Sequence, residues 1–185
     1  MKLFQRRRVP SPMELARFRA AADVFVFHRE DDLYVARVSA GRQRSVDRYH
    51  ALLTHLPTTV AFSLECVRSE REFVGDELTL VEVREAVARL KTPLVASGGV
   101  EVSVYTDDDQ VALSPLLDLW IYARSDRWLF ILLREGLEEV NELPARTWTV
   151  RREEFTGASE LVDAVTETAE RLTLRLMSRP RRPTS

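Results

Sequence analysis

The chain has 185 residues and a mass of 21.3 kDa, which suits one domain of ordinary size or two very small ones sharing a core. Its single cysteine, Cys66, excludes an intrachain disulfide, and no apolar run has the length of a membrane span. Hydrophobic residues at 45% and charged residues at 30% are typical of a soluble globular protein. We therefore expect a cytoplasmic protein without membrane insertion.

Basic charge is concentrated at the two ends of the chain. Residues 1–8 hold four basic groups and residues 179–185 hold three, with no acid in either stretch; the remaining 20 basic and 29 acidic groups give residues 9–178 a formal charge of about −9. We predict a basic flexible segment at 1–12, a single domain at 13–178 and a basic flexible tail at 179–185. The acidic body disfavours binding of phosphate backbones, although the basic ends leave contacts with nucleic acid or acidic lipid open.

In the first half, the apolar spacing predicts three helices and three strands. A helix is expected at 13–22, and Pro57 should stop a second one at 45–56. Thr79 and Glu82 form a capping-box pattern that should start a third helix, which Pro93 should end. The strands are expected at 24–27, 33–38 and 58–67, with a bend at 73–75. The first two strands should form a hairpin with a four-residue polar turn at 29–32.

The second half is predicted to be richer in strands. Strands are expected at 100–105, 111–113 and 147–151, with a turn at Asp107–Asp109, a bend at 155–157 and a helix at 161–177. The most apolar stretch, Asp118–Leu133, reads as two strands joined by a four-residue turn, which would place Trp120 opposite Ile131. Both faces of that hairpin are apolar, so we expect both to be covered.

Two pairs of segments resemble each other in the same order along the chain. Asp23–Val38 aligns with Asp118–Leu133 without a gap, and Arg71–Leu90 matches Glu153–Leu172 at seven of twenty positions. These echoes predict two pseudo-repeated ββ(x)βα halves, at 23–91 and 100–177. The predicted fold class is α+β, with a largely antiparallel sheet on which amphipathic helices pack.

The repeat suggests where a partner could bind. Phe25 and Phe27 occupy the positions of Trp120 and Tyr122, so the four aromatic residues could line a seam about a pseudo-twofold axis. Core packing and a partner-facing surface both remain open for them. As a partner-binding surface we predict the aromatic residues Phe25, Phe27, Trp120, Tyr122 and Trp128.

No catalytic, cofactor-binding or metal-binding set stands out. His50 and His55 are five residues apart and do not share a helix face as ligands four apart would, and His28 is distant in sequence from both. Asp107–Asp109 lacks the spacing of a calcium loop, and Cys66 lies in an apolar strand pattern. We therefore predict no catalytic residue, cofactor or metal, and an enzyme of unknown class stays the weakest alternative.

A second reading places single-stranded nucleic acid on the sheet. Aromatic side chains can stack bases while arginines hold phosphates. The predicted order of the second half, four strands and then a helix, resembles a Pur or Whirly repeat, and that resemblance implies binding of single strands. The residues for this alternative are Arg124, Arg127, Trp148, Arg151 and Arg152.

Taken together, these features favour a non-catalytic protein-interaction module. Such a protein, of the chaperone, adaptor or immunity-inhibitor type, would act through a sheet face or edge. A second copy of the chain is the simplest partner that it could have.

Overall fold

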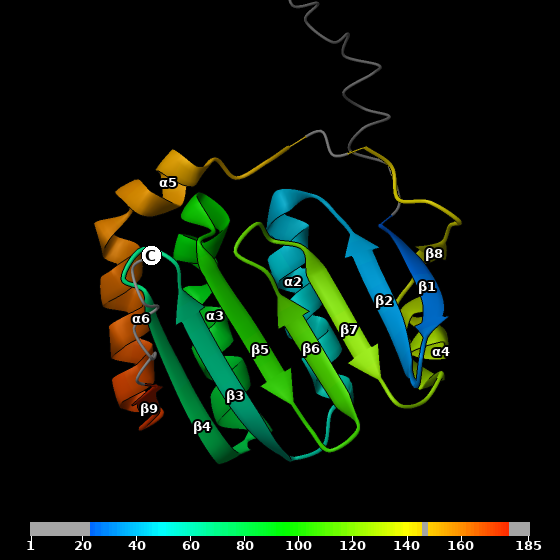
Figure 1. Ribbon diagram of the computed structural model, residues 1–185, viewed down its shortest axis with the longest axis horizontal. Coiled ribbons are helices and arrows are strands. Elements are labelled where there is room, and N and C mark those ends of the chain that lie inside the picture. Colours follow the sequence, from blue (N-terminus) through cyan, green and yellow to red (C-terminus); the bar gives the residue numbers. More distant parts are fainter. Residues whose placement is uncertain (1–22, 146–147, 178–185) are drawn as a thin grey trace, which may run out of the picture.

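The computed structural model describes residues 23–145 and 148–177. The predicted helix at 13–22 and both basic ends, at 1–12 and 179–185, lie outside the described residues. Within them the fold is α+β, as predicted: five α-helices accompany a nine-stranded sheet in the order β8-β1-β2-β7-β6-β5-β3-β4-β9 (Figure 1). Neighbouring strands are antiparallel except β8, which runs parallel to β1.

Along most of the chain, groups of two or three strands are each followed by a helix. The strands are β1 (Val24–Glu30), β2 (Leu33–Ser39), β3 (Thr59–Cys66), β4 (Arg71–Thr79), β5 (Val100–Tyr105), β6 (Asp109–Leu113), β7 (Leu119–Ala123), β8 (Glu138–Glu139) and β9 (Arg175–Met177). The helices are α2 (Arg42–Leu52), the 3₁₀ turn η1 (Leu53–His55), α3 (Leu80–Ser97), α4 (Arg127–Arg134), α5 (Arg152–Gly157) and α6 (Ser159–Arg171). No helix of these ranges is both long and apolar enough to cross a membrane.

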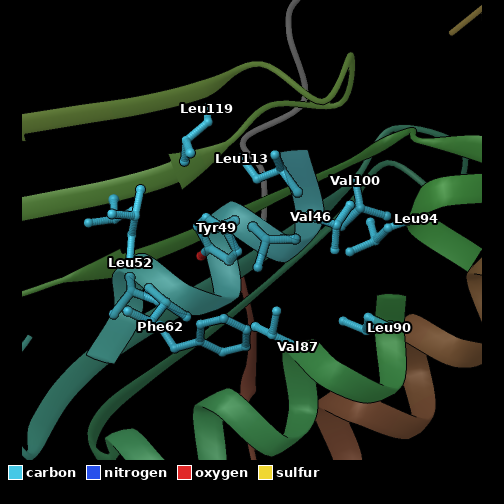
Figure 2. Close-up of a cluster of buried hydrophobic side chains, with 14 of the residues drawn as sticks. Val46, Tyr49, Leu52, Phe62, Val87, Leu90, Leu94, Val100, Leu113 and Leu119 are labelled. Carbon is cyan, nitrogen blue, oxygen red and sulfur yellow. The ribbon is translucent and has the colours of Figure 1, made fainter. Parts of the chain in front are cut away.

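All the long helices lie on one face of the sheet, so the core forms between that face and the helices (Figure 1). Alternate strand residues such as Val102 and Leu64 are fully buried there, because successive side chains of a strand point to opposite faces. Tyr49 of α2 and Val87 of α3 fill the same layer (Figure 2). The opposite face, which is in front in Figure 1, carries no helix among the described residues.

The first predicted hairpin is confirmed as β1 and β2. Glu30 pairs with Leu33, so the turn has two residues, Asp31 and Asp32, and not the four expected. Asp31 has φ 52°, a left-handed conformation that short polar residues tolerate and that two-residue hairpin turns require.

The second predicted hairpin is wrong. Only its first strand forms, as β7, and the next apolar residues form α4, so Trp120 does not pair with Ile131. Trp128 and Leu132, four residues apart, are fully buried, whereas Phe130 is 63% exposed on the other side of the helix. The six residues at 128–133 are apolar throughout, a pattern that suits a strand or a helix equally, so tertiary packing determines that a helix forms here.

The predicted duplication is not confirmed. Phe73 and Gly75 lie inside β4, so the bend expected there is wrong, while the matching Phe155 and Gly157 lie in α5. The two halves therefore place their most similar residues in elements of different type.

The observed helix boundaries confirm one of the predicted start and stop signals and contradict others. The capping box of Thr79 and Glu82 is confirmed at the start of α3. Pro93 lies inside α3, which continues to Ser97, so the predicted stop there is wrong; Leu94, just beyond it, is fully buried. α6 ends at Arg171, short of the predicted 177, and β9 follows. Of the strand predicted at 147–151, residues 148–151 form none.

Candidate functional site

We call one face of the sheet the uncovered face, because no described helix covers it. Two strips can be distinguished on it. The first, the aromatic strip, lies on β2, β7, β6 and β5 and comprises Arg37, Trp120, Tyr122, Gln110 and Tyr105. The second, the acidic strip, lies on β5, β3 and β4 and comprises Glu101, Glu65 and Glu72.

The aromatic strip is built around Trp120 and Tyr122, two residues apart on β7 and therefore on the same face. Their rings are stacked, with centroids 6.1 Å apart and planes within 6°. Arg37 is the cross-strand partner of Trp120, and its guanidinium lies 5.0 Å from the indole centroid. Asp118 holds that guanidinium in place through an ion pair of 3.2 Å, so the cation–π contact is fixed by a second charge.

Tyr122 carries an ionisable hydroxyl that stays protonated. Its half-burial raises its pKa above the usual value of 10.0, and the nearby carboxylates of Glu101 and Glu30 raise it further. At neutral pH the side chain is thus a neutral hydroxyl group that can donate a hydrogen bond to a bound partner.

The acidic strip brings three carboxylates side by side. Glu65 of β3 pairs with Glu101 on one side and with Glu72 on the other, so the three occupy adjacent cross-strand positions. Burial raises the pKa of Glu101, and the charges of Glu65 and Glu72 add to this rise. The three carboxylates give this part of the uncovered face a negative charge.

The predicted aromatic seam is wrong. Ala36 pairs with both Phe27 and Ile121, so Phe27 shares the helix-covered face of Ile121 and not the face of Trp120. Phe25 lies on that same covered face and is fully buried, as is Trp128 of α4. Of the five aromatic residues predicted to bind a partner, only Trp120 and Tyr122 lie on the uncovered face.

The residues predicted for nucleic acid are not brought together. Arg124 and Arg127 follow the end of β7, at the lower end of the sheet in Figure 1, and Arg127 is paired with Asp109. Trp148 is at the upper end, where its indole Nε1 donates to the carbonyl of Ala40 at 3.0 Å, and Arg151 and Arg152 lead into α5 there. The element order that resembled a Pur or Whirly repeat is also wrong, because three strands and not four precede the helix α4.

A hollow of about 680 Å³ lies at the lower end of the sheet, lined mostly by polar residues. Asp109, almost fully buried there, accepts hydrogen bonds from Arg127 and from the indole Nε1 of Trp128, the latter at 2.9 Å. His55 Nε2 lies 3.0 Å from Glu135 Oε1. These polar groups are hydrogen-bond partners of one another, and their bonds hold α4 against the sheet. Within the described ranges, no three His, Cys, Asp or Glu side chains are grouped so that they could hold a metal ion.

The edge of the sheet at β1 is another place where a strand could pair. In the described residues β8 pairs only with Val24 and Phe25, and beyond them a hollow of about 500 Å³ lies between β1 and residues 139–143. The open part of this edge ends in Arg29 and Glu30, and charged side chains of this kind discourage pairing at an edge.

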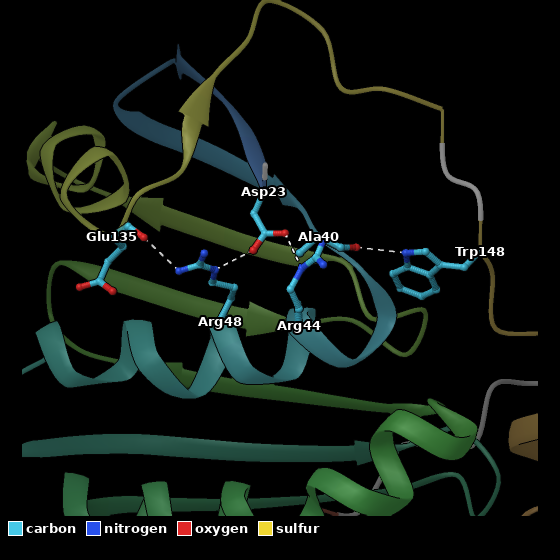
Figure 3. Close-up of polar contacts among 6 residues, drawn as sticks. All are labelled: Asp23, Ala40, Arg44, Arg48, Glu135 and Trp148. Carbon is cyan, nitrogen blue, oxygen red and sulfur yellow. Dashed lines mark hydrogen bonds and ion pairs between the residues drawn. The ribbon is translucent and has the colours of Figure 1, made fainter. Parts of the chain in front are cut away.

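A buried carboxylate fixes the start of β1 (Figure 3). The Asp23 side chain is 2% exposed and accepts hydrogen bonds from Arg44 Nε at 2.9 Å and from Arg48 Nε at 2.8 Å. Arg48 also donates to the carbonyl of Glu135 at 3.0 Å. One carboxylate thereby ties β1 to α2, and through Arg48 to the end of α4.

Comparison of the chain with protein-family models, with curated proteins and with solved structures found no match.

Proposed function

We propose that this protein is a non-catalytic interaction module that docks a protein partner on its uncovered face, with the aromatic strip as the point of contact. The observation that carries this proposal is the stacked pair of Trp120 and Tyr122, flanked by Arg37, on the face that no described helix covers. Tryptophan, tyrosine and arginine are the residue types that contribute most to binding energy at protein interfaces.

The physical character of the strip suits a protein surface. Its rings are rigid, and Asp118 restrains the arginine, so little side-chain entropy is lost when a partner binds. The neutral Tyr122 hydroxyl and the Gln110 amide beside it supply hydrogen bonds that orient the partner.

Single-stranded nucleic acid has less support as the ligand. The carboxylates of Glu101, Glu65 and Glu72 lie on the same face and repel phosphates. The arginines first considered for phosphate contacts are divided between two ends of the sheet.

The proposal can be tested by photo-cross-linking in cells that express the full chain. The photoreactive residue p-benzoylphenylalanine is placed at Gln110, which is the cross-strand partner of Tyr122, or at Glu85, which is exposed on α3. A discrete protein adduct at position 110 and none at position 85 would support docking on the uncovered face. An adduct at twice 21.3 kDa would identify the partner as a second copy.

A matched pair of substitutions distinguishes docking at the aromatic strip from nonspecific hydrophobic association. Trp120→Ser should reduce the adduct at position 110 strongly, because it removes the central ring of the strip. Phe130→Ser removes a more exposed aromatic ring from α4 and should leave that adduct unchanged. Equal adducts at positions 110 and 85, or insensitivity to Trp120→Ser, would contradict the proposal.

A further inference from the structure

The main chain of β1 is open along part of its outer side. Beyond β1 the described residues form only β8, which pairs with the first two residues of β1, so no described strand lies beside residues 26–30 (Figure 1). The backbone N–H of Val140 donates to the carbonyl of Phe25, so Phe25 directs its main-chain groups away from β2. These groups alternate in direction along an antiparallel strand, so those of Phe27 and Arg29 also point outward.

The hollow of about 500 Å³ lies against this open part of the strand. Its walls are Val26, Phe27 and His28 of β1, Arg37 of β2, and residues 139–143 at and after the end of β8. Its volume is within the range of about 300–1,000 Å³ that is usual for ligand sites in proteins. A space bounded on one side by outward-pointing main-chain N–H and C=O groups suits an extended chain that adds a strand to the sheet.

The charge of the hollow indicates what kind of chain it favours. Glu139 and Glu142 line it, and among the described residues neither carboxylate is in an ion pair. The arginine of the lining, Arg37, is already paired with Asp118 at 3.2 Å. A lysine or arginine on the incoming chain would therefore compensate the two glutamates.

The end of β1 limits the length of chain that this edge accepts. Residues 26–30 extend over about 16 Å at about 3.3 Å per residue, so a short segment fits beside them. Arg29 and Glu30 close this stretch with charged side chains, which discourage nonspecific strand pairing. The edge is thus selective for a short extended segment with the right charge.

We propose that the protein partner docked on the aromatic strip also adds a short, extended, basic segment to the edge of the sheet at β1. The segment pairs with the main chain of Phe27 and Arg29, and its lysine or arginine enters the hollow and compensates Glu139 and Glu142. This inference rests on the proposed function, because Arg37 belongs both to the aromatic strip and to the wall of the hollow. It adds the chemistry by which the partner is recognised.

Peptide selection on the purified full chain tests the inference with probes of defined sequence. Random heptapeptides are displayed on phage, and the enriched sequences are synthesised and titrated against the protein by fluorescence anisotropy. The enriched peptides should combine a lysine or arginine with β-branched or aromatic residues, and their affinity should fall as the salt concentration rises.

Two matched pairs of variants locate the bound peptide. The double variant Glu139→Gln, Glu142→Gln should weaken binding about fivefold or more, because two ion pairs are lost. The double variant Asp107→Asn, Asp108→Asn removes the same charge at the lower end of the sheet and should leave the affinity unchanged.

The second pair tests the main-chain contact. Arg29→Pro removes an outward N–H that the ladder between β1 and β2 does not use, and should weaken binding about fivefold or more. Arg29→Ala removes the same side chain but keeps the N–H, and should bind at least as tightly as the wild type. If Arg29→Pro does not fold, the two pairs of acidic substitutions still decide between the outcomes.

Amide hydrogen exchange measured by NMR identifies the pairing directly. The amides of Phe27 and Arg29 should exchange about tenfold or more slowly with peptide bound, whereas those of Val26 and His28, which face β2, should change little.

Three outcomes would overturn the inference. The first is a selection that yields no basic peptide, the second is an equal loss of affinity from the two double variants, and the third is unchanged exchange at Phe27 and Arg29 in the complex. A peptide that Trp120→Ser releases and the glutamate variant does not would belong to the aromatic strip and would also overturn it. None of these results alters the photo-cross-link at position 110, so failure of this inference is distinguishable from failure of the proposed function.

Discussion

Removing the Asp23 carboxylate should destabilise the fold measurably. The side chain is 2% exposed and accepts two charge-assisted hydrogen bonds, from Arg44 and Arg48. Hydrogen bonds to charged groups contribute about 1.5–3 kcal/mol each. The two arginine side chains are 45% and 28% exposed, however, so solvent takes up part of their charge when the carboxylate is removed. For Asp23→Ala we therefore expect a loss of about 2–3 kcal/mol in the free energy of unfolding, which is less than two such bonds would contribute in a fully buried site.

The measurement is urea denaturation followed by circular dichroism, together with a thermal scan in which the midpoint should fall by about 4–12 °C for a chain of this size. A double-mutant cycle with Arg48→Ala should show that the two losses are not additive, because the residues share one network. Arg48→Ala should destabilise the fold more than Arg44→Ala, because Arg48 also donates a hydrogen bond to the carbonyl of Glu135. A loss below about 0.5 kcal/mol for Asp23→Ala would refute the role given to this carboxylate.

Three further predictions concern single side chains. Trp128→Phe removes the indole that donates to Asp109 at 2.9 Å and leaves a gap in the core, so unfolding in urea should show a loss of about 2–3 kcal/mol; an unchanged midpoint would contradict the contact. The pKa of His50 is lowered from 6.5 by burial and then by the charge of Arg84, so the unfolded chain binds more protons below pH 6.5. The stability of the wild type should therefore fall relative to that of His50→Gln as the pH drops below 6.5, and parallel pH profiles would refute this. Thr79→Ala removes the capping oxygen of α3 and should lower the thermal midpoint. Thr79→Ser keeps a hydroxyl oxygen at this position and should retain most of the stability.

Much of the sheet was predictable because its signals are local. The alternation of Val60, Phe62 and Leu64 with less buried residues identifies β3, and Thr79 with Glu82 identifies the start of α3. Both features depend only on residues within one element, so no knowledge of the fold was needed to find them.

The error at α4 has a physical cause that lies outside the segment. Arg127–Arg134 is apolar along most of its length, and its helical form is held by the bond from Trp128 to Asp109, which is 19 residues earlier in the chain. A continuous apolar run does not reveal its period, so the tertiary partner decided the outcome.

The candidate site was predicted only in part for a related reason. Trp120 and Tyr122 stand out as aromatic residues, but their face depends on β2 pairing with β7, more than 80 residues apart. That same pairing places Phe27 on the opposite face. The acidic strip was missed entirely, because its three glutamates come from three different strands and only the strand order brings them together.

The proposed docking of a protein partner on the uncovered face depends on Trp120 and Tyr122. The most direct measurement is the yield of protein adduct from p-benzoylphenylalanine at Gln110, compared between the otherwise unchanged chain and Trp120→Ser. If the partner docks there, a discrete adduct should form that Trp120→Ser removes and Phe130→Ser does not. An adduct that is absent, or that persists undiminished without the Trp120 ring, would contradict it.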